Sequence, residues 1–227
     1  MPDPASNAEL LRSLGRLVRG LSALFWGLPI ALIAGFYTAK ADSLKAFGIV
    51  PPLVTTGLLA FGLWQLGEFQ RQERVWRIAL DRAKVLSLLN FGLSPFLYWW
   101  NKIPDNLFFL LMVTILSISA VLFLGSVNLV LRRLGDMLPD EALRLETRQF
   151  TALNINLLVA IFAFAVLCVA AAQIHKPPHW LVTFLGVVER GNLWFLVLPS
   201  LLPLAMTMAL IWKTKEVILD NVFGASA

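Results

Sequence analysis

Long apolar runs, separated by short polar or charged stretches, make up most of the sequence. A helix needs about 20 mostly apolar residues to cross the ~30 Å hydrocarbon core of a bilayer. The pattern therefore predicts an all-α, polytopic membrane bundle, a single transmembrane domain over residues 1–227. Its six transmembrane helices would form three hairpins, with spans at about 21–39, 49–67, 85–100, 107–131, 156–173 and 193–212.

The third run, 85–100, is the shortest of the six. As a helix it would rise only ~24 Å, at 1.5 Å per residue, so it either crosses the membrane with its ends extended or forms a re-entrant hairpin broken at Pro95. If it crosses, most of the 19 lysines and arginines fall on one side together with both termini. That bias weakens if the run does not cross. Because positive residues concentrate on the cytoplasmic side, we predict a crossing, with both termini inside.

Three further stretches carry an amphipathic rather than a uniformly apolar pattern. In residues 8–19, leucines recur at three- and four-residue steps opposite arginines, and residues 68–84 and 178–188 also place apolar side chains at helical spacing. Such helices lie along the membrane surface. We therefore predict three short interfacial helices.

Composition supports a membrane location and narrows the partners. The chain is 58% hydrophobic and only 15% charged, against ~25% charged residues in soluble domains. The net charge of +5 comes from basic residues between apolar runs, which favours contact with anionic lipid headgroups on the cytoplasmic side over nucleic acid. We expect a multi-pass protein of a bacterial inner (plasma) membrane.

Small residues mark a packing stripe on the first predicted span. Gly27, Ala31 and Gly35 are spaced by four, which lets another helix approach closely. This stripe favours association, either with a second copy or within a larger membrane complex.

Polar residues are the next candidates for a site. In the six-span arrangement several lie toward the cytoplasmic ends of their helices, and a stripe on the third span adds others. Two interpretations remain open, an inward-facing polar vestibule and hydrogen bonds that hold the bundle, and we favour the second. The residues concerned are Gln65, Glu68, Asn90, Ser94, Tyr98, Asn128, Asn154 and Asn156. No charged residue lies in the middle of a predicted span, which argues against a proton relay or a voltage sensor.

A basic cluster after the fourth span is a candidate site for a headgroup or a phosphate: Arg132, Arg133, Arg144 and Arg148. A solvated, salt-bridged helix explains the same residues, and we favour that explanation. No metal or other cofactor is expected, because the two histidines, His175 and His179, flank a pair of prolines and have no cysteine or carboxylate nearby.

No motif for nucleophilic, hydrolytic or nucleotide chemistry is visible, such as G-x-S-x-G, H-E-x-x-H or a Walker loop. The function that we favour is therefore a non-enzymatic membrane subunit or scaffold that acts through helix–helix association. The alternative is a channel or carrier for a neutral or amphipathic solute. An enzyme acting on lipid headgroups is the third interpretation.

Overall fold

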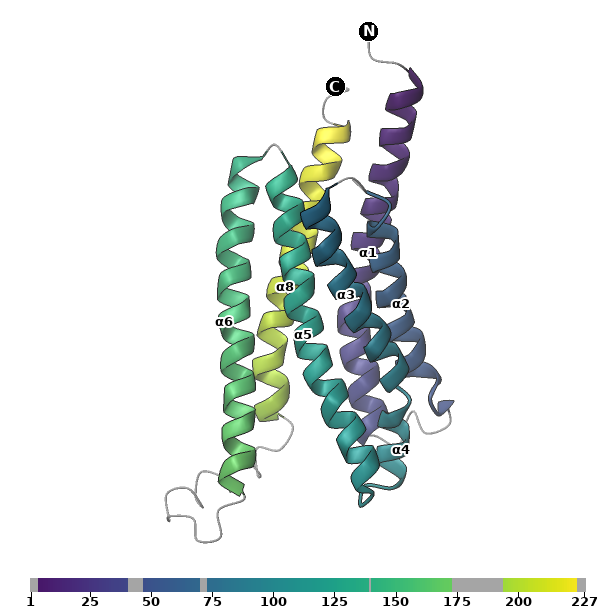
Figure 1. Ribbon diagram of the computed structural model, residues 1–227, viewed down its shortest axis with the longest axis vertical. Coiled ribbons are helices and arrows are strands. Elements are labelled where there is room, and N and C mark those ends of the chain that lie inside the picture. The colour runs from purple at the N-terminus through teal and green to yellow at the C-terminus, as the bar shows by residue number, and fades with distance from the viewer. Residues whose placement is uncertain (1–3, 41–46, 70–72, 139, 173–193, 224–227) are drawn as a thin grey trace.

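The computed structural model describes residues 4–40, 47–69, 73–138, 140–172 and 194–223. Within them every regular element is a helix, so the all-α class predicted from the sequence is confirmed. The helices are α1 (Pro4–Lys40), α2 (Val50–Leu66), α3 (Arg74–Leu93), α4 (Phe96–Lys102), α5 (Leu107–Met137), α6 (Glu141–Ala172) and α8 (Trp194–Phe223). The long helices run along one axis in alternating directions, so that α1 begins and α8 ends at the same end of the bundle (Figure 1). We call this the terminal end.

Three described segments are long and apolar enough to cross a membrane: Arg12–Ala39, Leu107–Met137 and Glu141–Phe164. Helix α2 is also apolar, but it is shorter. These helices support the membrane location predicted from composition.

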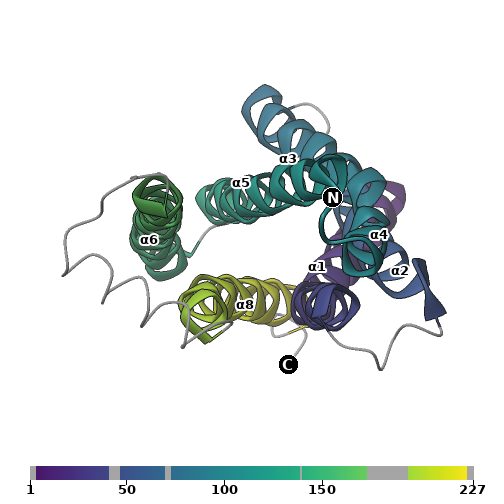
Figure 2. The ribbon, with the colours of Figure 1, turned by 90° about the horizontal axis from the view of Figure 1, so that it is seen from below.

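Neighbouring helices form a ring in the order α1, α2, α3, α5, α6 and α8, which returns to α1. Helix α5 also contacts α8 across the ring, and α4 packs against α1 and α5. Viewed along the axis, α6 stands at the edge of the bundle, beside α5 and α8 (Figure 2). The buried core lies mostly toward the terminal end, where Leu17 and Leu21 of α1 join Trp76 of α3, Leu131 of α5 and Ile211 of α8.

Two of the three predicted interfacial helices differ from the structure. Residues 8–19 form no separate interfacial helix; they are part of α1, which continues unbroken to Lys40. The predicted helix 68–84 begins only at Arg74, and it continues without a break to Leu93. The stretch 178–188 lies outside the described residues.

The break in the third predicted span falls at Pro95. Helix α3 ends there with Ser94 as its C-cap, and α4 starts at Phe96. Proline has no N–H to donate to the preceding turn, which is why the helix is interrupted at this point. Segment 85–100 is therefore the end of α3 followed by α4.

Glycines bring α1 and α2 into close contact. A Cβ at Gly20 would lie 2.7 Å from the Gly62 carbonyl oxygen and 2.3 Å from Leu66 Cδ1, and one at Gly27 would lie 2.8 Å from Leu59 Cδ2. Real Cβ atoms do not approach other atoms so closely, so the two backbones can touch at Gly20 only because it lacks a Cβ, while Gly27 leaves room for the Leu59 side chain. Two residues before α2, Gly48 has a φ of 60°, which a residue with a Cβ adopts only with strain.

Candidate functional site

A buried polar junction joins α5, α6 and α8. Its centre is the hydroxyl of Thr207 on α8, which accepts hydrogen bonds from Asn128 Nδ2 at 2.8 Å and from Asn154 Nδ2 at 2.9 Å. The same hydroxyl donates to the Pro203 carbonyl at 2.8 Å, and Asn154 Nδ2 also reaches that carbonyl, at 3.1 Å. All three side chains are buried. We call these three residues the junction; it pairs polar groups that would otherwise be costly inside a membrane.

Two details show how the junction is held. Asn128 Nδ2 also donates to the Leu124 carbonyl of its own helix, at 2.8 Å. Thr151 donates to the Asn128 carbonyl at 3.3 Å, which links α6 directly to α5. One acceptor is left over, because Asn154 Oδ1 is buried without a hydrogen-bond partner in the described structure. The junction therefore holds three helices together and keeps one free acceptor.

We expect Thr207→Val to lower the free energy of unfolding by about 1 kcal/mol. The substitution removes the acceptor shared by the two asparagines, but each amide keeps one other hydrogen bond, so the loss is near the usual value for one interhelical polar contact. Chemical unfolding in mixed micelles measures it. Thr214 is the matched control on the same helix, since it is buried and its hydroxyl bonds only the Leu210 carbonyl of α8 itself. A loss of equal size in Thr214→Val would show that the effect is not specific to the junction.

The polar residues predicted on the third span lie on another side of the ring. Ser94 is buried; it donates to the Phe91 carbonyl at 2.9 Å and accepts from Thr56 of α2 at 3.4 Å. Asn90 is also buried, with Oδ1 unpartnered in the described structure, and Ser119 Oγ on the neighbouring helix α5 is in the same situation. These side chains contribute to the α2–α3–α5 packing.

The other residues predicted to line a vestibule are spread over the bundle. Glu68, just after α2, pairs with Arg16 of α1. Tyr98 on α4 is half-buried, with the Lys102 ammonium 5.1 Å from its ring centre, and Gln65 on α2 is half-buried. Asn156 on α6 is exposed on the outside of the bundle. The eight side chains therefore separate into several groups, and only Asn128 and Asn154 share a hydrogen-bond partner, the Thr207 hydroxyl.

The basic cluster after the fourth span is largely paired within the protein. Asp136 lies 3.1 Å from Arg148 and 3.8 Å from Arg133, and its carbonyl accepts from Arg144 at 3.4 Å. Arg132 Nε and Arg144 Nε are buried without a partner in the described structure. This arrangement fits the salt-bridged helix pair better than an open headgroup site.

Asp140 does not pair with Arg144 in the described structure. Its carboxylate instead accepts from the N–H groups of Ala142 at 2.9 Å and Leu143 at 3.2 Å. It thus caps the start of α6, where free N–H groups and the helix dipole favour a carboxylate.

The small-residue stripe on α1 is used inside the chain. Gly27 packs against Leu58 and Leu59 of α2, and a Cβ at Gly35 would lie 3.8 Å from Leu97 of α4. Ala31 is partly buried and packs against the hydrophobic core of the bundle. Sequence reasoning missed the tighter contact at Gly20, as well as Thr207, the hydroxyl at the centre of the junction. The signal for Thr207 was present, as a hydroxyl residue within a long apolar run.

The side chains can therefore link helices, cap them and attract anions at the terminal end. Among the described residues no group of three or more His, Cys, Asp or Glu side chains is placed to hold a metal ion, and His175 and His179 lie outside those residues. Comparison with protein-family models, with curated proteins and with solved structures finds no match.

Proposed function

We propose that the protein crosses the membrane six times, with both termini on the cytoplasmic side, and acts as a non-enzymatic subunit through association with a second copy of itself. The alternating direction of the helices supports six crossings, with α3 and α4 together making the third (Figure 1). The described charged residues support the orientation, since most of them, including Arg16, Asp136 and Lys213, lie toward the terminal end. Positive residues favour the cytoplasmic side, where anionic lipids are also found.

The observation that carries the association is the exposed amide of Asn156. Arg148 marks the charged part of α6, and Asn156 lies ~12 Å further along the helix axis at 1.5 Å per residue, between the exposed apolar side chains of Leu153 (58%) and Val159 (61%). Its amide has no hydrogen-bond partner among the described residues. An unpaired amide facing hydrocarbon costs free energy, which a partner helix recovers by hydrogen bonding to it.

The surface around Asn156 suits a close helix contact. Ala152 and Ala160 lie one turn before and one turn after it, and both are exposed. Small residues on each side of an amide allow two helix backbones to approach. An amide both donates and accepts, so Asn156 of one copy can bond Asn156 of the other across a two-fold axis. A second copy is thus sufficient as the partner.

We expect Asn156→Leu to raise the dimer dissociation constant roughly 5- to 30-fold. This corresponds to about 1–2 kcal/mol for an interhelical amide contact. The measurement is fluorescence energy transfer between labelled copies reconstituted in liposomes at several protein-to-lipid ratios.

Two control variants keep the experiment specific. Asn156→Gln retains an amide and should retain dimers. Thr114→Leu makes a comparable change on the exposed face of α5, where the hydroxyl already bonds the Leu110 carbonyl at 2.8 Å, and it should not alter association. A monomeric wild-type protein, or an Asn156→Leu variant that dimerises normally, would contradict the proposal.

A further inference from the structure

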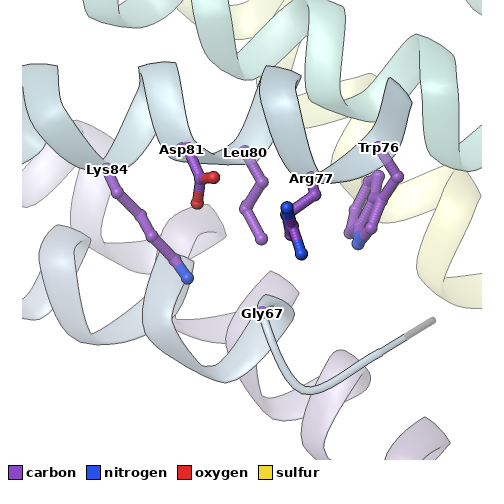
Figure 3. Close-up of a pocket in the computed structure, with 6 residues that line it drawn as sticks. All are labelled: Gly67, Trp76, Arg77, Leu80, Asp81 and Lys84. Carbon is purple, nitrogen blue, oxygen red and sulfur yellow. The ribbon is translucent and has the colours of Figure 1, made fainter. Parts of the chain in front are cut away.

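A hollow lies between the end of α2 and the first turns of α3, and it has a volume of about 240 Å³. Figure 3 shows its lining side chains, which extend from α3 toward Gly67 at the end of α2. We call it the α2–α3 pocket. Its lining residues are Gly67, Trp76, Arg77, Leu80, Asp81 and Lys84.

Two cations of the α2–α3 pocket have no anionic partner. Among the described residues, neither Arg77 nor Lys84 forms an ion pair, and the Lys84 ammonium lies over the ring of Trp64, 5.6 Å from its centre. This contrasts with Arg133 and Arg148, which share Asp136. Arg77 and Lys84 can therefore accept an external anion, whereas Arg133 and Arg148 of the basic cluster are already paired with Asp136.

The walls of the pocket are fixed. Trp76 is 1% exposed, and its indole N–H donates to the Phe69 carbonyl at 3.1 Å, which ties α3 to the segment that follows α2. A Cβ at Gly67 would lie 2.4 Å from Lys84 Nζ. The absence of a side chain at Gly67 therefore lets the ammonium approach the C-terminal end of α2, where the helix dipole favours a positive charge.

The pocket lies at the level where α3 changes from charged to apolar. Lys84 is followed directly by Val85, which is 65% exposed, and one turn later by the exposed Leu88. On the other side of Asp81, a hollow of about 520 Å³ runs between α3 and α5, with a mainly apolar lining that includes Val85, Leu86 and Leu122. A lipid with its phosphate in the pocket would thus have apolar surface beside it for its acyl chains.

We propose that the α2–α3 pocket binds the headgroup of an anionic glycerophospholipid whose headgroup carries a hydroxyl donor, such as phosphatidylglycerol. Arg77 and Lys84 hold the phosphodiester through charge-assisted hydrogen bonds. Asp81, the one carboxylate in the lining, accepts a hydrogen bond from a headgroup hydroxyl. This inference rests on the membrane location proposed above, but not on dimer formation through Asn156.

The test compares lipid binding by native mass spectrometry of the full-length protein in a neutral detergent. Phosphatidylglycerol and phosphatidylcholine are added separately, because the second has no hydrogen-bond donor in its headgroup. We expect the wild-type protein to bind phosphatidylglycerol preferentially. Arg77→Gln/Lys84→Gln should bind it at least about tenfold more weakly, since two basic contacts are lost. Gly67→Ala should also weaken binding, because its methyl group displaces the ammonium of Lys84.

The matched control is Arg12→Gln/Arg74→Gln, which removes the same charge from exposed positions of α1 and α3 that lie outside both the α2–α3 pocket and the hollow between α3 and α5. Retained binding in this variant supports the proposal, and an equal loss in both double variants overturns it in favour of general surface attraction. Binding of soluble glycerol phosphate with no preference for the lipid would also overturn it, in favour of a soluble phosphate ligand. Asn156→Leu should bind lipid normally, so that a failure here is distinguishable from a failure of the dimer proposal.

Discussion

Replacing Gly20 with leucine is expected to lower the free energy of unfolding by about 3 kcal/mol, at the upper end of the usual cost of overpacking. A Cβ at this position meets the backbone carbonyl of Gly62 at 2.7 Å, and a backbone cannot move aside as a side chain can. The two helices must therefore separate along the contact that α1 and α2 make near the terminal end. Unfolding in mixed micelles, followed by circular dichroism, measures the loss.

Gly15→Leu is the control, since it makes the same change on the same helix where nothing lies within 4 Å of the added Cβ. It should change stability little. Gly20→Ala should show an intermediate loss, because the clash with the carbonyl begins at Cβ. If Gly15→Leu and Gly20→Leu were equally destabilising, the effect would come from helix propensity or membrane insertion rather than from the α1–α2 contact.

The sequence predicted the class of fold, because long apolar runs leave few alternatives to membrane helices. It placed the helix ends less well. The first predicted span began at Leu21, since Gly20 follows the charged Arg19 and resembles the end of an interfacial helix. The helix continues through Gly20 because backbone hydrogen bonding is indifferent to a change in hydrophobicity. The same reasoning explains α3, which passes from Lys84 to Val85 without a break.

Sequence position indicates how deep a residue lies, but not which side of the helix bundle it faces. Asn90, Asn128 and Asn154 were grouped by depth, and the structure joins only the last two, through Thr207. The sequence also did not indicate which charged residues form ion pairs between helices. Asp136 was one of several acidic residues in the sequence, but it lies between Arg133 and Arg148 in space. Sequence spacing predicts contacts within one helix, whereas these contacts also join different helices.

The second prediction with a large effect tests the membrane topology. An impermeant reagent should label cysteines on one side of the bilayer in intact cells and leave those on the other side unlabelled. In a protein whose single cysteine, Cys168, is replaced by serine, we expect Lys102→Cys to react with an impermeant maleimide on intact cells. Arg82→Cys and Arg133→Cys should react only after the cells are permeabilised. All three positions are exposed, so differences in labelling reflect the side of the membrane rather than burial.

Each pair of positions tests one crossing. The charge-free part of α5, 107–131, would be ~37 Å long at 1.5 Å per residue, enough to separate Lys102 from Arg133 across a ~30 Å core. Arg82 and Lys102 are separated by the shorter path through α3 and α4, interrupted at Pro95. If Arg82→Cys and Lys102→Cys were labelled from the same side, this segment would be re-entrant. The α2–α3 pocket would then face the same side as Lys102, and the headgroup that it binds would have to come from that leaflet.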